Sequence, residues 1–155
     1  MWIPTSSPSS SARKSQRRTA TDQTGRTKGH PLSDEQITEW VRRAAHAADD
    51  KLGQRTDAFF VGDVLGITDW FVVTSGNNSR QVKAIVEEVE HKVARDGGPK
   101  PVRVEGLDDT MSWVLMDYGS FVVHVFDDEA REYYELERLW QDVRHLDLNL
   151  PEQAT

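Results

Sequence analysis

Cysteine is absent from this 155-residue chain. Its absence excludes disulfide bonds, a catalytic thiolate and zinc held by sulfur. The chain also lacks an apolar run near the roughly eighteen residues that a membrane-spanning helix needs. Its longest apolar runs, such as residues 70–73 and 121–123, have the length of strands. Its five histidines include no pair at the i, i+4 spacing that places two metal ligands on one helical face.

Basic residues are scarce outside the N-terminal segment. Residues 1–30 hold six Lys or Arg and one Asp, whereas the rest of the chain holds thirteen basic and twenty-five acidic residues, a net charge of −12. Phosphate backbones repel a body of this charge. We therefore expect any association with a nucleoprotein to go through a basic protein and not through naked RNA. The alternative is that the acidity serves solubility alone.

Residues 1–31 are rich in Ser, Pro, Lys and Arg and poor in apolar residues. Such a segment buries too little surface to offset its ordering entropy, so it is expected to be a disordered tail. It is either a plain extension, a remnant of an upstream start codon or of cloning, or an organellar transit peptide. A folded domain is expected over residues 32–146, followed by a flexible C-terminus over residues 147–155.

Three segments have the periodicity of helices. Ser33 and Gln36 form a capping box ahead of apolar residues at helical spacing over residues 37–48, and Gly53 is expected to stop this helix. Asn78, with Gln81 as its reciprocal partner, caps a second helix with an apolar stripe over residues 82–93. A third helix is expected after Asp127 and Asp128. Its apolar residues are Tyr133, Leu136, Leu139, Trp140 and Val143.

Strand-like segments lie between these helices at residues 58–64, 68–74 and 100–105, and residues 112–126 predict a β-hairpin. The order α, β, β, α, β, β, β, α predicts a single α/β domain with a mixed β-sheet flanked by helices. The segments 68–74 and 100–105, joined by the second helix, are expected to form a right-handed crossover.

A two-residue turn at Gly119 and Ser120 sets the expected register of the hairpin, with Tyr118 opposite Phe121 and Trp113 opposite Phe126. Side chains alternate between the faces of a strand. One face is then apolar: Val114, Met116, Tyr118, Phe121, Val123 and Val125. The other mixes aromatic with ionisable residues: Trp113, Leu115, Asp117, Val122, His124 and Phe126. That mixture is typical of the centre of a protein interface. The alternative is that helices cover this face and His124 bonds Asp117 or backbone.

Five blocks of the sequence stand in an order that matches a known family. They are Thr68–Gly76, Ser79–Val82, Trp113–Gly119, Phe121–Phe126 and Arg131–Trp140. Together they resemble the ribosomal silencing factor (Iojap-like) family, over roughly residues 33–145. The family usually has Gly-Asp where this chain has Gly119-Ser120, and both pairs suit a tight turn.

The resemblance implies a nucleotidyltransferase-like core without catalytic carboxylates. It also implies a partner, the large-subunit ribosomal protein fourteen, and a translational repressor that blocks joining of the small subunit when nutrients are scarce. A large-subunit assembly factor, or an interaction scaffold that uses the same docking surface, is the alternative. The family further implies a homodimer in the cytoplasm, or in an organelle if the tail is a transit peptide.

The expected partner-binding residues combine the mixed hairpin face with the family signature. They are Trp113, Asp117, Tyr118, Leu115, His124, Phe126, Tyr133 and Tyr134. Trp113 and Asp117 are supported by both arguments. Arg131 is expected to support either the C-terminal helix or a dimer contact.

An enzyme is the rival class. Nucleotidyl transfer needs a divalent metal held by convergent carboxylates, which this kind of fold supplies as an Asp-x-Asp pair that the chain lacks. Its adjacent aspartates, such as Asp108 and Asp109, point in different directions. Asp117 and His124 alone, without a nucleophile or a pocket, do not make a catalytic site. We therefore expect no catalysis, no metal and no cofactor.

Overall fold

A computed structural model of the chain describes residues 33–150, so the expected tail lies outside the described residues. The elements are α1 Asp34–Asp50, β1 Gln54–Phe60, α2 Gly62–Leu65, β2 Trp70–Gly76, α3 Ser79–Arg95, β3 Arg103–Glu105, β4 Trp113–Asp117, β5 Phe121–Asp127, α4 Asp128–Tyr134 and α5 Leu136–Leu139. The chain divides into two units, residues 1–36 and 37–155. The sheet and the helices packed on it, from Ile37 onward, belong to the second unit.

One mixed sheet of order β1-β2-β5-β4-β3 organises this unit, which confirms the predicted fold class. β2 and β5 run parallel, and the other neighbours pair antiparallel. The connection from β2 through α3 leads to β3 at the far edge, so β5 and β4 lie between the two strands of the expected crossover. The nucleotidyltransferase-like description of this core stays a prediction.

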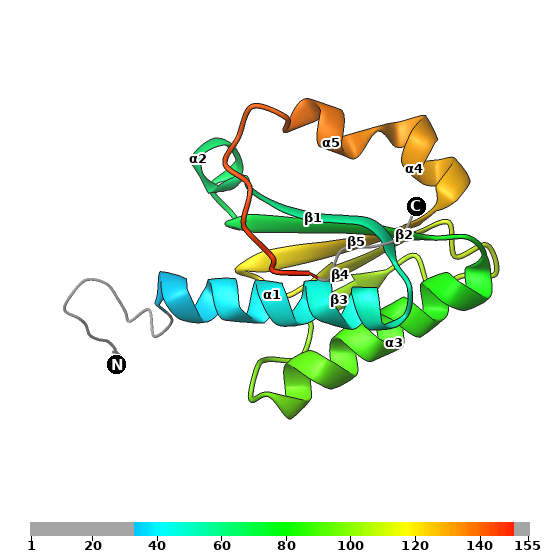
Figure 1. The fold of residues 1–155 in the computed structure, drawn as a ribbon, viewed down its shortest axis with the longest axis horizontal. Coiled ribbons are helices and arrows are strands. Elements are labelled where there is room, and N and C mark those ends of the chain that lie inside the picture. Colours follow the sequence, from blue (N-terminus) through cyan, green and yellow to red (C-terminus); the bar gives the residue numbers. More distant parts are fainter. Residues whose placement is uncertain (1–32, 151–155) are drawn as a thin grey trace, which may run out of the picture. The chain divides into compact units, whose positions relative to one another are not determined.

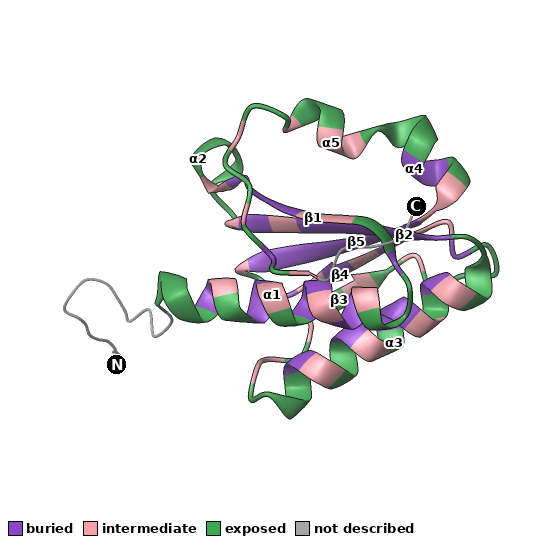
Figure 2. Ribbon diagram, in the orientation of Figure 1, coloured by how far each residue is buried: buried purple, intermediate pink, exposed green. Residues whose placement is uncertain are grey.

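Helices lie on both sides of the sheet (Figure 1): α1 and α3 on one side, α4 and α5 on the other. The side facing α1 and α3 is closed, because the apolar stripe of α3 and alternate residues of β2, β4 and β5 are all buried. Figure 2 shows the central strands as buried and much of α4 and α5 as exposed. The two short helices therefore cover their side of the sheet only in part.

Both predicted N-terminal caps are present. The Gln36 backbone N–H donates to Ser33 Oγ at 3.1 Å, and the Gln81 N–H donates to Asn78 Oδ1 at 2.9 Å. The reciprocal bond differs from the expectation, because Gln81 Oε1 accepts from the N–H of Asn77 at 2.7 Å and not from Asn78. The Gln81 amide also donates to the carbonyls of Lys51 and Leu52. The Gln81 side chain thus occupies the turn after β2.

The first predicted strand is misplaced at both ends. β1 begins at Gln54, and residues 62–64, expected to be strand, lie in the helical turn α2, Gly62–Leu65. Here the Val61 N–H donates to the carbonyl of Asp69 at 2.8 Å, which folds the chain into a tight loop toward β2. Gly53 takes part in the expected stop, because its N–H donates to the Ala48 carbonyl at 2.8 Å, but it is not the left-handed residue there. Leu52 takes the left-handed conformation at φ 65°, whereas a Cβ on Gly53 would lie 2.5 Å from Thr74 Oγ1.

The predicted third helix is two short helices. Glu135 has φ 48°, a left-handed conformation that ends α4 and starts α5 in a new direction. Asp127 is the cap, since its Oδ1 accepts from the Ala130 N–H at 2.7 Å. Between α5 and residue 150, the last one described, the chain forms no helix. It runs beside β1, where the Phe60 N–H donates to the Arg144 carbonyl at 2.8 Å and the Leu146 N–H to the Ala58 carbonyl at 2.9 Å.

The C-terminal segment continues onto α1. Arg42 Nε donates to the Asp147 carbonyl at 3.0 Å, and His46 Nε2 lies 2.8 Å from the Leu148 carbonyl. The Leu148 side chain is buried. The expected boundary before residue 147 therefore does not mark the last packed residue.

Candidate interaction surface

The hairpin register is as predicted. Trp113 pairs with Phe126, Leu115 with His124 and Asp117 with Val122. The apolar face, toward α3, is buried at every position: Val114, Met116, Tyr118, Phe121, Val123 and Val125. The side chains of the opposite face therefore point toward α4, as the alternation required.

Aromatic side chains from β4 and α4 meet on this opposite face. Trp113 stacks on Phe126 with ring centroids 4.9 Å apart, and it lies 4.7 Å from the ring of Tyr134. Tyr133 packs edge-on against Tyr134 at 5.0 Å. Tyr133 is 79% exposed and Tyr134 50% exposed, while Trp113, Leu115 and Asp117 are half-buried along β4. We call these five residues the aromatic surface.

Three of the expected contact residues lie inside the protein. Phe126 is fully buried beneath Trp113, and His124 is 3% exposed. Tyr118 is buried on the other face, where its ring stacks on Phe121 at 4.6 Å. Burial, reinforced by Glu90, raises the pKa of Tyr118. In this structure these three side chains do not reach a partner directly, so any part that they play is indirect.

His124 bonds to Trp113 and not to Asp117. The Trp113 indole Nε1–H donates to His124 Nδ1 at 3.1 Å, and the imidazole and Phe71 rings make a T-shaped contact with centroids 4.5 Å apart. Burial lowers the pKa of His124 to about 4. Asp117 bonds elsewhere: its Oδ1 accepts from the Gly119 N–H at 2.8 Å, and its Oδ2 lies 3.6 Å from Arg103 Nη2.

Arg131 joins α4 to the edge of the sheet. Its buried guanidinium donates to the carbonyls of Gln54 and Arg55 at 2.8 and 2.5 Å, at a bulge in β1. It also donates to Glu137 Oε2 at 2.8 Å. Burial lowers the pKa of Arg131, and the pairing with Glu137 opposes that shift. Arg131 Nη1 also donates to Ser75 Oγ of β2 at 3.2 Å. Of the two roles expected for Arg131, the structure supports the first, since these bonds attach α4 and α5 to β1 and β2.

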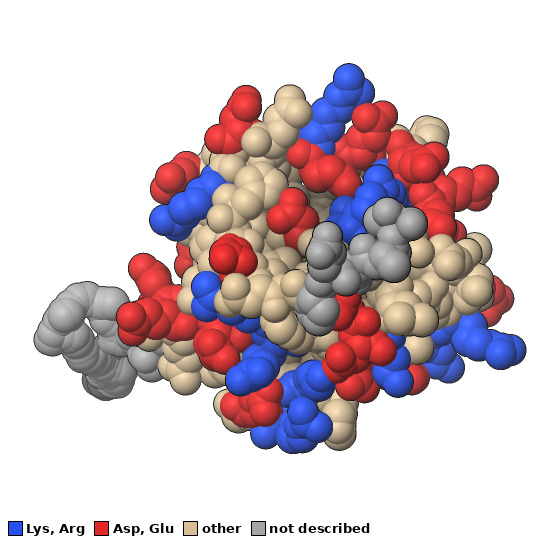
Figure 3. All heavy atoms as spheres, viewed as in Figure 1, with Lys and Arg blue, Asp and Glu red and all other residues tan. Residues whose placement is uncertain are grey.

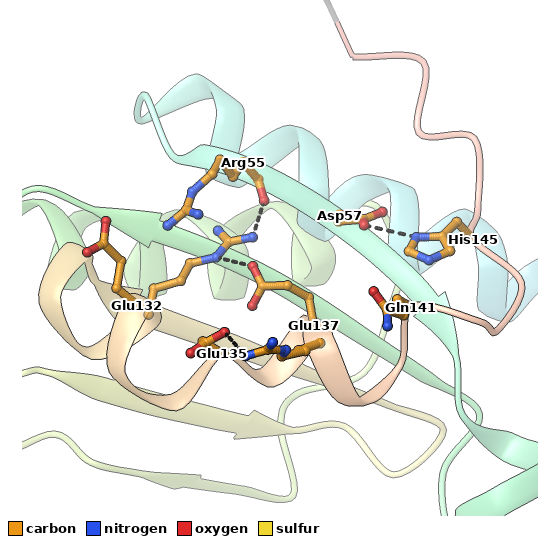
Figure 4. A pocket seen from close by; sticks show the side chains of 9 residues that line it. Arg55, Asp57, Glu132, Glu135, Glu137, Gln141 and His145 are labelled. Carbon is orange, nitrogen blue, oxygen red and sulfur yellow. Dashed lines mark hydrogen bonds and ion pairs between the residues drawn. The ribbon is translucent and has the colours of Figure 1, made fainter.

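A cavity of about 680 Å³ adjoins this network. In Figure 4 the side chains of Arg55 and Glu132 lie on one side of it, and Gln141 and His145 on the other. Burial opposes ionisation of Glu137 there, but hydrogen bonds from its own backbone and from Arg131 hold its pKa below the usual range. Sequence reasoning found Arg131 but not this cavity, because its lining comes from β1, α4, α5 and the segment after them.

Within residues 33–150 no cluster of three or more His, Asp or Glu side chains is placed to hold a metal ion. Over the same range, no helix is both long and apolar enough to cross a bilayer. Figure 3 shows acidic and basic side chains interspersed on one face of the molecule, with acidic ones gathered where α4 lies. The arrangement offers an aromatic patch with an acidic margin.

Comparison with known proteins gives concordant matches. The family model described as "Ribosomal silencing factor during starvation" matches residues 34–155. A relative from Halalkalibacterium halodurans, named ribosomal silencing factor RsfS, is 39% identical over 110 residues, covering 71% of this chain and 92% of that protein. A mouse protein named "Mitochondrial assembly of ribosomal large subunit protein 1" is 39% identical over 75 residues, 47% of this chain and 32% of that protein.

A solved structure agrees as well. The crystal structure of a protein from Chromobacterium violaceum aligns with a TM-score of 0.64 at 30% identity, covering 74% of this chain and 93% of that one. The family match includes the whole sheet and every residue of the aromatic surface. On this evidence the chain belongs to the ribosomal silencing factor family.

Proposed function

We propose that this protein binds the large ribosomal subunit through ribosomal protein fourteen and thereby blocks joining of the small subunit, which lowers translation when nutrients are limiting. The observation that carries the proposal is the aromatic surface, which combines half-buried Trp113 with exposed Tyr133 and Tyr134 on a chain of this family. The protein acts by occupying a surface and not by catalysis.

The aromatic surface has the composition of an interface centre. Trp and Tyr are enriched among the residues that dominate binding energy, and they lose little conformational entropy on binding. Burying a large apolar side chain contributes roughly 1.5–3 kcal/mol, of which association takes several kcal/mol back. Trp113 and Tyr134 touch each other, so one partner pocket can bury both.

The charge of the domain favours a basic protein as the contact. Outside its first thirty residues the chain carries twenty-five acidic and thirteen basic residues, and several acids lie on α4 and α5 beside the aromatic surface. Opposite charges steer association and leave the dissociation rate little changed. We therefore expect the association rate with large subunits to fall as salt is raised, and an association rate independent of salt would contradict the steering.

A role in large-subunit assembly is the second candidate. The mouse relative is named for assembly of the mitochondrial large subunit, and the same docking surface serves either role. A blocker has to prevent joining of finished subunits, whereas an assembly factor acts before the large subunit is complete. We place the protein in the cytoplasm, or in an organelle if residues 1–31 are a transit peptide, and we propose that it is a homodimer when free.

Co-sedimentation tests the proposal. The purified chain is mixed separately with large subunits, small subunits and joined ribosomes, and subunit joining is then titrated. We expect binding to free large subunits alone and a dose-dependent loss of joining. Trp113→Ala should weaken binding by at least tenfold, because truncating a central aromatic residue of an interface removes about 2 kcal/mol or more.

Ile67→Ala is the matched control. Ile67 is 85% exposed in the connection between α2 and β2, which contacts the hairpin at its turn, where the Asp69 N–H donates to the Ser120 carbonyl. Trp113 lies at the other end of β4. The variant thus removes an exposed apolar side chain outside the aromatic surface. It should bind as the wild type does. Binding to no particle would leave only the family membership standing, and equal losses for the two variants would place the contact elsewhere. Binding without loss of joining would favour assembly over silencing.

A further inference from the structure

We propose that His124 is a positioning residue for partner binding: it holds the Trp113 indole in one orientation before the partner arrives. This inference rests on the proposed function, because it takes the aromatic surface as the contact. His124 itself is 3% exposed and lies beneath that surface, so it acts through Trp113 and touches no partner.

Two aromatic rings contact Trp113, Phe126 in a stacked arrangement and Tyr134 in a tilted one. The Trp113 ring lies against Phe126 at 4.9 Å with an interplanar angle of 30°, and against Tyr134 at 4.7 Å with an angle of 49°. Ring contacts of this kind restrict the plane of the indole but discriminate weakly between its two edges. The bond to His124 Nδ1 supplies the missing direction, because it binds only the edge that carries Nε1–H.

The chemistry of the two groups determines their protonation. An indole N–H can only donate, so His124 Nδ1 must be the acceptor and the imidazole proton must lie on Nε2. Nε2 is itself buried and has no hydrogen-bond partner within the described residues. A buried donor without a partner is destabilising. Because no acceptor among the described residues lies at Nε2, the tautomer protonated there is not favoured by a bond at that atom. We therefore assign its selection to the Trp113 N–H, which bonds Nδ1.

A fixed indole favours binding. A side chain that is ordered before association does not lose its rotational freedom on binding, and this difference corresponds to about three- to tenfold in affinity for one large side chain. His124 also contacts Phe71 in the core of the sheet. The orientation of an interface residue is thereby set by a buried residue of a central strand.

Two substitutions of nearly equal shape separate the hydrogen bond from packing. His124→Asn retains an acceptor oxygen near the position of Nδ1, whereas His124→Leu has the shape of Asn without the acceptor. Affinity for large subunits is measured for the full chain. We expect His124→Asn to bind within about twofold of the wild type and His124→Leu to bind about three- to tenfold more weakly.

Trp113→Phe provides a test that a merely structural role would not pass. Phenylalanine keeps the stacking but has no N–H, so His124→Leu should produce no further loss of affinity in the Trp113→Phe background. An equal loss in both backgrounds would overturn the inference, because it would mean that His124 acts on the fold. Equal binding by His124→Leu and wild type would overturn it as well.

Proton exchange of the Trp113 indole in the free wild-type chain tests the bond without any variant at His124. Its N–H signal is the one that disappears in Trp113→Phe. We expect it to exchange more slowly than that of an unbonded indole, and fast exchange would overturn the inference even if His124→Leu did not fold. If wild type binds no large subunits but the indole is protected, the proposed function fails while the bond stands, so the two failures are distinguishable.

Discussion

The two sides of the sheet differ in how completely they are covered. Toward α1 and α3, the inward residues of β4 and β5 are aliphatic or aromatic and all buried. Toward α4 and α5, the same strands present Trp113, Asp117 and His124, and the helices above them leave the end at β4 partly open. The side toward α1 and α3 is a closed core. The side toward α4 and α5 is buried along β5 but partly exposed along β4. Substitutions on the two sides should therefore affect different measurements.

The largest loss of stability is expected on the closed side. Phe121→Ala removes a fully buried ring at the first position of the middle strand β5, and such truncations lower the free energy of unfolding by about 3–5 kcal/mol. Urea denaturation followed by circular dichroism measures this change. A loss below about 1 kcal/mol would mean that this side of the sheet is loosely packed, against the comparison drawn above.

The next effect is a dependence of stability on pH, which comes from His124 on the side of the sheet that faces α4 and α5. His124 has a pKa of about 4 in the folded protein, against about 6.5 in an unfolded chain. Between these values the unfolded chain binds the proton and the folded protein does not, so stability falls as pH drops through 6.5 toward 4. On account of this group, the free energy of unfolding is about 3 kcal/mol lower below pH 4 than above pH 6.5.

His124→Asn isolates this contribution, because it removes the titrating group and leaves the carboxylates in place. Denaturation midpoints at pH 7.5, 6 and 5 should converge for the two proteins as the pH falls, with the wild type losing more. Parallel curves would show that His124 is not held neutral by burial.

A smaller loss of stability is expected at β4, where the side of the sheet that faces α4 and α5 is partly exposed. Trp113 is half-buried, so Trp113→Ala should lower the free energy of unfolding by about 1–2 kcal/mol, less than the value for a buried aromatic residue. Thermal unfolding of the two alanine variants side by side gives the comparison. If Trp113→Ala is as destabilising as Phe121→Ala, Trp113 is a core residue and the aromatic surface is smaller than proposed.

The smallest effect is expected at Asp117. Asp117→Asn retains the acceptor for the Gly119 N–H and removes only the charge facing Arg103, whose side chain is 62% exposed. Exposed pairs of this kind contribute about 0–1 kcal/mol. Unfolding should thus be nearly unchanged, while the salt dependence of association with large subunits should weaken. A change of several kcal/mol in unfolding would show a structural role for this carboxylate.

Local signals in the sequence predicted most of the fold. The caps at Ser33 and Asn78 and the turn at Gly119 are written in residues a few positions apart, and each was found where it was expected. Because the turn sets the register, both faces of the hairpin followed correctly from it. The family resemblance rests on the same kind of signal, since its blocks are contiguous.

Features that depend on distant segments were missed. Periodicity continues through Glu135, but α4 ends there because Arg131 holds α4 to the bulge of β1 and bonds Glu137 from the next helix. The burial of His124 likewise depends on Phe71 of β2, some fifty residues earlier in the chain. Alternation places a side chain on a face, but it does not show how much of that face a later helix covers.

The segment after α5 has a consequence for the solubility of the chain. A sheet has two outer strands, and an outer strand with free backbone groups is a template on which other chains can add. β3 limits this risk by being three residues long and carrying Arg103 and Glu105. β1 is seven residues long, and its outer edge is occupied by Arg144 and Leu146. The segment at Arg144 and Leu146 thus protects the edge of β1 from pairing with another chain. A chain shortened before Arg144 would retain its aromatic surface but tend to self-associate.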